Sequence, residues 1–468
     1  MNIAKTAGRG AAAIFLLCAR LGTLAAQDAA AGRRVSLDEY RALALANNLD
    51  VHIAESELEK SKLVRSGAFT RYFPAVSATA ALAKPNIFGG GAQAGISSDF
   101  NNQSLYTFDV PNKVIHIDET IDFSDPLGVW LGTVTFTQTL FAGGRIVNSN
   151  RLAQKAVDAS AYKLHIRRGE IFAQAESKYY QYALLGELIT TLDGYKQTLD
   201  NLYAKVAQAL EQGVVSRSDY LRVSLKREEI AIQRDEMAQM RVVAGDDFKL
   251  FAGIKDGSAV SVDGVFGDIA EPPDDAGDAA ARLPLRPEFQ LLVIQRDAAK
   301  LEEAIAFGGY LPSIELGVSF LRTDFSFNSA LFANTSGYYQ DFVGFLLFNI
   351  PLSAWWEGVY KTREKGAARR SAEEQLAVNA DYLMLDLRNK LTAWQTAYKR
   401  VKLAEIGVQY AKTNREEFEQ KYSAGLSSLS DYLMALALEH ENSAKLDQAR
   451  ANYHIAATAF QTASGTAR

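Results

Sequence analysis

The same short pattern occurs twice in this sequence, as GVVSRSDYL at residues 213–221 and as GLSSLSDYL at residues 425–433. Each copy places a serine three residues after a glycine, and an aspartate three residues after that serine. Glycine adopts the positive φ that ends a helix. Serine caps the helix that follows, where an aspartate at the third position is favoured by the helix dipole. Each copy therefore predicts a tight turn between two helices.

The segments beside these turns have room for unusually long helices. The ten prolines leave residues 127–271 and 352–468 free of proline, which costs roughly 3 kcal/mol inside a helix. A helix from Gly144 to Gly213 would extend roughly 100 Å at about 1.5 Å per residue. A rod of that length does not belong to a compact globule.

Apolar residues run along both long segments at steps of three and four, which is the heptad pattern of coiled coils, and in the second segment Lys390 and Arg415 interrupt this pattern. In the first segment they are Leu185, Leu188, Leu192, Tyr195, Leu199, Leu202, Val206 and Ala209. In the second segment they are Leu376, Ala380, Leu383, Leu387, Trp394, Ala397, Val401, Ala404, Val408, Ala411 and Phe418. The pattern predicts two antiparallel coiled-coil hairpins.

The two halves of the chain are related by duplication. The turn motifs lie 212 residues apart, and Phe248 and Phe460 share this offset. Earlier in each half, Tyr72-Phe73-Pro74 corresponds to Tyr310-Leu311-Pro312. We therefore expect two repeats, each made of a helix, two strands and a long helical hairpin.

The repeats are assigned to residues 27–252 and 287–468. Between them, residues 253–286 are rich in aspartate and contain two adjacent prolines. We interpret this segment as a solvated acidic connector without chemistry of its own.

Each repeat is predicted to open with a helix. In the first half the capping box Ser36-Leu37-Asp38-Glu39 begins a helix that runs to about Tyr72, because the residue before Pro74 is disfavoured in a helix. In the second half the corresponding helix opens at Pro287 and ends before Pro312.

Two segments with alternating apolar and polar residues follow each of these helices, as expected for strands. Their apolar sides include Val76, Ala78, Ala80, Leu82, Val134, Phe136, Ile314, Leu316, Val318 and Phe320, and a last strand covers 342–350. A sheet with one apolar face suits either a lipid-facing barrel or a sandwich with one buried side. Four strands cannot close a barrel, so a lipid-facing sheet requires several chains, and three chains would supply twelve strands.

Aromatic residues stand near the ends of the predicted strands, as they do at the interfaces of outer-membrane barrels. These candidate membrane-interface residues are Tyr72, Phe73, Trp130, Tyr310, Trp355 and Trp356. A long insertion rich in glycine, asparagine and serine, at about 84–128, separates the first two strands.

Residues 1–26 read as a secretory signal peptide, with a charged start, an apolar run at 11–19 and small residues at Ala25 and Ala26. Cleavage there removes Cys18, the single cysteine, so neither a disulfide framework nor a thiolate metal site is expected. The charge of -5, from 50 Lys and Arg against 55 Asp and Glu, gives no reason to expect a nucleic-acid partner.

Motifs of catalysis are missing from the sequence. No histidine pair has the HExxH spacing, and neither a GxxxxGK[ST] phosphate loop nor a GxSxG elbow occurs. The protein is therefore predicted not to be an enzyme and to hold no cofactor or metal.

The duplicated turns, the two Tyr-x-Pro motifs and the leading Ser36-Leu37-Asp38-Glu39 followed by Ala46-Asn47-Asn48 together resemble the TolC family of outer-membrane channel proteins. The resemblance covers essentially everything after the signal peptide. It implies a mainly α-helical homotrimer with a twelve-stranded membrane β-barrel and a long helical tunnel. The location it implies is the outer membrane of a Gram-negative bacterium, with the tunnel extending into the periplasm.

The function implied by this resemblance is that of a passive exit duct. The implied partners are a periplasmic adaptor protein, an inner-membrane transporter and the outer-membrane lipid. Small-molecule efflux is the first expectation, and protein export in a type I secretion system is the second. From a different class, a soluble periplasmic coiled-coil scaffold is the alternative that the heptads alone would support.

The resemblance also assigns two candidate sites. The hairpin tips would contact the adaptor protein through Gly213, Ser216, Asp219, Leu221, Gly425, Ser428, Asp431 and Leu433. Close to the second tip, Glu416, between Arg415 and Glu417, would form an acidic ring at a periplasmic constriction. Both sets also have a purely structural interpretation, as helix caps and as a solvated charged helix face.

Overall fold

The computed structural model describes most of the chain as two compact units. The described residues are 33–83, 109–110, 113–114, 128–255, 260–262, 266–275, 279–327 and 335–465. The helical unit comprises Met1–Leu63, Gln154–Ala298 and Arg369–Arg468, and the strand unit comprises Val64–Ala153 and Ala299–Ala368. The predicted signal peptide and most of the insertion predicted at 84–128 lie outside the described residues.

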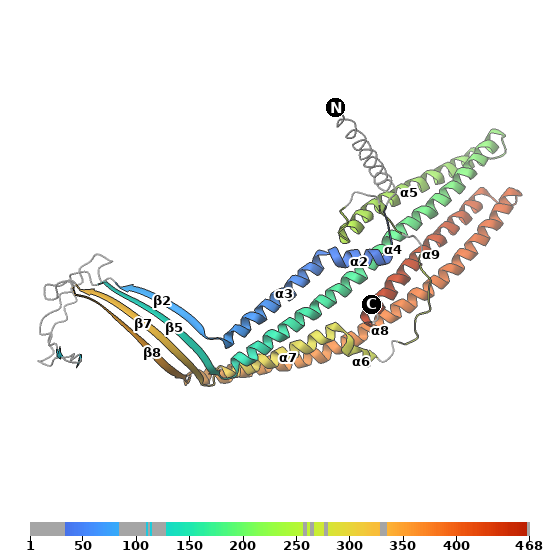
Figure 1. Ribbon diagram of the computed structural model, residues 1–468. Helices are drawn as coiled ribbons and strands as arrows, with labels where there is room; N and C mark the ends of the chain where they lie inside the picture. Colours follow the sequence, from blue (N-terminus) through green and yellow to red (C-terminus); the bar gives the residue numbers. More distant parts are fainter. Residues whose placement is uncertain are drawn as a thin grey trace, which may run out of the picture. The chain divides into compact units, whose positions relative to one another are not determined.

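Two long helical hairpins make up most of the helical unit, as predicted (Figure 1). The first pairs α4 (Arg145–Glu211) with α5 (Arg217–Phe251), and the second pairs α8 (Ala354–Ser423) with α9 (Leu429–Ala463). The predicted heptad positions lie in the helix contacts, where Leu199, Val206 and Val401 are almost completely buried. One apolar cluster contains residues of α4, α5 and α9, so the two hairpins share a core.

The first predicted helix is broken, and the prediction of one helix from Ser36 to about Tyr72 was wrong. The structure has α2 (Leu37–Asn47), α3 (Leu49–Phe69) and a 3-10 turn (Thr70–Tyr72). Asn48 causes the break, because its backbone is extended and its side-chain oxygen accepts a hydrogen bond from the Asp50 amide at 2.9 Å. The same asparagine therefore ends α2 and caps α3.

Only one of the two hydrogen bonds of the predicted capping box is present at the start of α2. Ser36 Oγ accepts a hydrogen bond from the Glu39 amide at 3.2 Å, as expected for a capping serine. The Glu39 carboxylate instead accepts a hydrogen bond from Arg33 at 2.7 Å.

The acidic connector is packed onto helices at several points and is not simply solvated. Its strand β6 (Val260–Val262) pairs in parallel with β1 (Arg33–Val35). Further along, the Tyr453 hydroxyl donates to the Ala270 carbonyl at 2.5 Å, and the Gln395 amide donates to the Pro273 carbonyl at 2.8 Å. Backbone carbonyls make these contacts, so the acidic composition gave no sign of them. The repeat boundaries on either side, at 252 and 287, stay a prediction.

The connector leads into the second half of the chain. It ends in the short α6 (Ala279–Arg282) and a 3-10 turn (Leu283–Leu285). The helix predicted to open at Pro287 is α7 (Pro287–Gly308), which ends before Pro312 as expected.

One antiparallel sheet of four strands, in the order β2-β5-β7-β8, lies in the strand unit, together with the adjoining ends of several helices (Figure 1). Its strands are β2 (Ala75–Ala83), β5 (Gly128–Ala142), β7 (Ser313–Phe327) and β8 (Thr335–Asn349). The short β3 (Asp109–Val110) and β4 (Lys113–Val114) form a separate ladder. The central pairing of β5 with β7 joins the two halves of the chain, which leaves β2 and β8 as the edges of this sheet.

The strands are longer than the sequence pattern suggested. β8 begins at Thr335 and not at Phe342, and β5 begins at Gly128, so Trp130 lies inside a strand and not before it. Fifteen residues extend roughly 50 Å at about 3.3 Å per residue, which is more than a tilted transmembrane strand needs.

The pairing register separates an apolar face from a mixed face. Val76, Phe136 and Val318 are directly opposite one another across three strands, and so share one face. On the other face the hydroxyls of Thr135 and Ser319 are 2.9 Å apart. A register shift between Thr139 and Phe141 places Phe141 opposite Ile314, on the apolar face.

Candidate functional site

Both hairpin tips have the predicted turn. Gly213 and Gly425 have φ of 73° and 71°, a left-handed conformation in which any other residue would be strained. Ser216 Oγ accepts a hydrogen bond from the Asp219 amide at 3.1 Å, which caps α5.

The second tip repeats this cap and completes it. Ser428 Oγ accepts from the Asp431 amide at 3.2 Å, and the Asp431 carboxylate accepts from the Ser428 amide at 3.2 Å. The structural interpretation of the glycine, serine and aspartate positions is therefore confirmed. Contact with an adaptor stays a prediction.

The apolar residues of the two tips are not equivalent. Leu221 is exposed, whereas Leu433 is only 8% exposed and packs in the cluster shared by the hairpins. Val214 and Leu426, which directly follow the glycines, are 73% and 79% exposed. These two residues were not among the predicted tip contacts, although their place directly after each helix-ending glycine was a usable sequence signal. They offer the tips an apolar surface that Leu433 does not.

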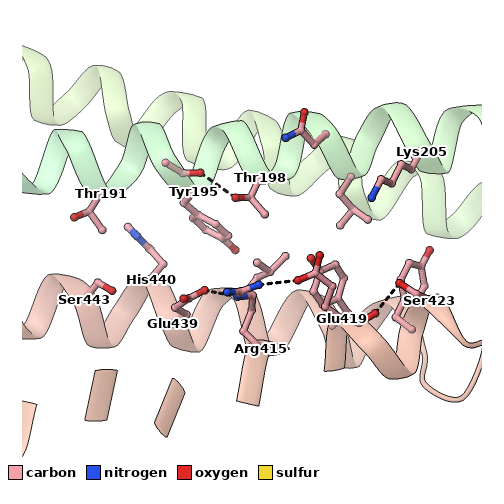
Figure 2. Close-up of a pocket in the computed structure, with 16 residues that line it drawn as sticks. Thr191, Tyr195, Thr198, Lys205, Arg415, Glu419, Ser423, Glu439, His440 and Ser443 are labelled. Carbon is pink, nitrogen blue, oxygen red and sulfur yellow. Dashed lines mark hydrogen bonds and ion pairs between the residues drawn. The ribbon is translucent and has the colours of Figure 1, made fainter. Parts of the chain in front are cut away.

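A polar cavity of about 540 Å³ lies between α4 and the second hairpin (Figure 2). Figure 2 shows side chains of α4 on one wall and side chains of α8 and α9 on the other. Among the residues that line it are Tyr195, Thr198, Lys205, Arg415, Glu419, Glu439 and His440. Charged and hydroxyl groups dominate this lining, in contrast to the apolar seam of an ordinary coiled coil.

Arg415 connects the two helices of the second hairpin inside this cavity (Figure 2). Its Nε lies 2.9 Å from Glu439 of α9, and its Nη1 lies 2.7 Å from Glu419 of α8. Glu416 is half exposed and only 3.4 Å from Arg415, and Glu417 pairs with Lys421 at 2.6 Å. The three predicted constriction residues thus have different surroundings, because Arg415 lines the cavity, Glu416 is half exposed beside it, and Glu417 is paired with Lys421.

Two of the residues that line the cavity, His440 and Tyr195, form a stacked pair of rings. The imidazole of His440 stacks on the ring of Tyr195, with centroids 4.9 Å apart and planes 18° apart. Burial raises the pKa of Tyr195 to about 12, and its hydroxyl has no hydrogen-bond partner among the described residues.

The apolar face of the sheet is exposed within the chain. Its exposed large side chains include Val76, Phe136, Leu316, Val318, Phe342, Leu346 and Phe348. Apolar surface on this scale marks a contact with lipid or with another protein.

Most of the predicted interface aromatics are also accessible. Tyr72, Phe73, Trp130 and Trp356 are exposed, and Trp356 lies in the first turn of α8. Tyr310 is partly buried against Gly358. The side chain of Trp355 lies outside the described part of the chain.

None of the helices in the described residues combines the length and the apolar character needed to cross a membrane. Nor do the described residues bring three or more His, Cys, Asp or Glu together in a group that could hold a metal ion.

The sequence matches the family model described as "outer membrane efflux protein" over residues 41–239 and 282–466, which together exceed half of the chain. No curated protein matches the sequence.

Several solved structures share the fold. The CmeC outer membrane channel of Campylobacter jejuni is 16% identical with a TM-score of 0.72, and the match covers 92% of this chain and 85% of that chain. The MtrE outer membrane channel of Neisseria gonorrhoeae, in its open state, is 15% identical with a TM-score of 0.71. The match covers 92% of this chain and 88% of that chain. CusC is 12% identical with a TM-score of 0.75, and the match covers 93% of this chain and 93% of that chain. At these identities the likeness shows the fold.

Proposed function

Because this chain belongs to the outer membrane efflux protein family, we propose that it is the passive exit duct of a tripartite system that exports small molecules. The members of this family are channels and not enzymes, and they lie in the outer membrane of Gram-negative bacteria and extend into the periplasm. This location argues against the soluble periplasmic scaffold.

The observation that carries the proposal is an open sheet with an exposed apolar face. Lipid does not tolerate unpaired strand edges, so β2 and β8 need partners if the sheet lies in a membrane. Pairing of β8 of one copy with β2 of the next satisfies both edges. Three copies then give a closed barrel of twelve strands, wide enough to enclose a passage.

The helices support the same assembly. α5 exposes a stripe of apolar side chains on one side, formed by Leu221, Leu225, Ile232, Val243 and Leu250. α8 exposes Leu403, Ile406 and Tyr410. A trimer in which hairpins of adjacent copies pack side by side covers both stripes, and the twelve long helices then surround one tunnel.

The exposed residues of the hairpin tips support a contact with a partner protein. Val214 and Leu426 form small apolar projections that fit a contact with a periplasmic adaptor protein. The energy for transport comes from an inner-membrane transporter, because the sequence contains no nucleotide-binding motif.

The test is complementation of a strain that lacks the gene. Deletion is expected to increase susceptibility to a panel of drugs, dyes and metals, and the wild-type gene restores resistance. The double variant Val214→Asp/Leu426→Asp is expected to reach the outer membrane as an oligomer but to leave the strain susceptible.

The matched control adds the same charges one residue before each glycine. Gln212→Asp/Ala424→Asp should restore resistance, since both positions are already exposed. Unchanged susceptibility to every compound after deletion would contradict efflux. Loss of a secreted protein instead would identify type I secretion.

The constriction proposal has its own test in planar bilayers. Three copies of Glu416 would form a ring of carboxylates that favours cations, so Glu416→Gln should roughly halve the ratio of cation to anion permeability. Glu417→Gln, at the next position of α8 and so about 100° around the helix, should leave the ratio unchanged. Equal ratios in the wild type and in Glu416→Gln would remove Glu416 from the permeation path.

A further inference from the structure

The contact between α4 and α9 joins the two hairpins of one chain through polar side chains. The helices run antiparallel, so rising residue numbers on α4 meet falling numbers on α9. The pairs along this seam are Glu176 with Thr458, Tyr180 with His454, Thr191 with Asp447, and Tyr195 with His440. A helix seam normally buries apolar residues, so a row of titratable groups here needs an explanation.

Two of these pairs have the same geometry. His454 stacks on Tyr180 with centroids 4.7 Å apart and planes 13° apart, and His440 stacks on Tyr195 at 4.9 Å and 18°. The two histidines are two heptads apart on α9, which places them on the same face of that helix. The same stacked tyrosine–histidine pair therefore occurs at two positions along the α4–α9 contact.

The surroundings of both imidazoles disfavour the protonated form. His440 Nδ1 and His454 Nε2 are buried and have no hydrogen-bond partner among the described residues. Burial lowers the pKa of both rings, while a backbone hydrogen bond to Gly267 raises that of His454 in part. A proton added to either buried nitrogen would bring a positive charge without an acceptor.

The charged groups around His440 do not offset that cost. Lys226 of α5 lowers its pKa further, and Glu441 of α9 raises it. In the cavity, the carboxylate of Glu439 forms an ion pair with Arg415 of α8. None of the described carboxylates makes an ion pair with this histidine.

The surroundings of His454 are similar. Behind Tyr180, the carboxylate of Glu176 is occupied by Arg41 of α2 and by the hydroxyl of Thr458. Phe266 of the connector lies beside this pair, with its centroid 6.2 Å from that of His454 and 6.3 Å from that of Tyr180. This histidine likewise has no carboxylate of its own among the described residues.

We propose that the α4–α9 seam is a proton-responsive latch, closed while His440 and His454 are neutral and opened when both are protonated. The inference rests on the proposed function, because the opening would widen the periplasmic end of the duct. Opening of the periplasmic end would then be regulated by pH, because the two hairpins of each chain separate when the periplasm becomes acidic.

The sign of the response follows from linkage. A histidine whose pKa is lowered in the packed seam binds protons better in the open seam, so acidification below about 6.5 favours opening. Asp447 and Glu187 act in the opposite direction, because burial raises the pKa of each carboxyl group and acidification then favours packing. Removing the histidines should therefore abolish or reverse the response.

The experiment measures the distance between the two tips of one chain. Spin labels are attached in Val214→Cys/Leu426→Cys, at exposed positions, in the full mature chain without Cys18. Labelled chains are diluted with unlabelled ones, so that each oligomer reports one pair. Between about pH 7.5 and about pH 5 the distance is expected to increase, reversibly, with a midpoint below the ordinary imidazole value of about 6.5.

Variants identify the groups responsible. His440→Phe/His454→Phe keeps a ring for stacking but cannot be protonated, and should show no increase; His440→Gln/His454→Gln serves if the first variant does not fold. His165→Phe, at an exposed position of α4, should respond like the wild type.

A constant distance in the wild type, or the same increase in the histidine variant, would overturn the latch. The measurement needs neither substrate nor partner. A chain that responds to pH but fails to restore drug resistance would contradict only the proposed function, and one that restores resistance without responding would contradict only the latch.

Discussion

Phe136→Arg is expected to prevent stable assembly of the protein in the outer membrane, whereas Thr135→Arg is not. Phe136 lies on the exposed apolar face of β5, directly opposite Val76 and Val318. An arginine on the lipid face of a barrel costs about 2–4 kcal/mol at the middle of the bilayer, and a trimer carries three copies. Thr135, the next residue, points to the other face.

The two variants form a matched pair because they place the same charge on the same strand. Thr135→Arg loses the hydrogen bond with Ser319, which contributes about 1 kcal/mol. The measurement is the amount of oligomer in the outer-membrane fraction after a high-salt wash. Equal losses for both variants, or a greater loss for Thr135→Arg, would show that the apolar face is not turned towards lipid.

Glu176→Gln should destabilise the helical unit by about 3 kcal/mol, at the lower end of the range for breaking a buried ion pair. Glu176 is 3% exposed, and its carboxylate binds both Arg41 of α2 and the Thr458 hydroxyl of α9. The lower end applies because Arg41 keeps Asp38 at 2.6 Å as a second partner.

An exposed ion pair on the same helix provides the comparison. Glu170→Gln breaks a contact with Arg167 at 2.9 Å, where both side chains are more than 40% exposed, and should cost less than about 1 kcal/mol. Urea unfolding followed by helical circular dichroism compares the two midpoints. Equal midpoints would mean that Glu176 does not connect the three helices.

Local signals predicted the elements whose cause is local. The turns at Gly213 and Gly425 need only a positive φ and a capping serine, and both are visible in nine residues. The heptads predicted some of the buried positions of the hairpins, such as Leu199 and Val401, whereas others, such as Leu185 and Leu376, are only partly buried. The alternation of residues in β5 and β7 predicted the two faces of the sheet.

Features that depend on distant residues were not predictable in the same way. Arg415 meets Glu439 because of the register between α8 and α9, which no spacing in the sequence states. Leu221 and Leu433 occupy the same place in the repeated motif, yet only Leu433 packs against the other hairpin. The break at Asn48 did have a local signal, an asparagine two residues before an aspartate, although no proline marks it.

The central claim is that several copies of this chain close one sheet around a common axis. The oligomer can be extracted from the outer membrane with detergent and released from the micelles in native mass spectrometry, which measures the number of chains directly. We expect three chains, because three sets of β2, β5, β7 and β8 give twelve strands and an open bore. A monomer would contradict it, and so would a dimer, whose eight strands would leave an interior filled by side chains.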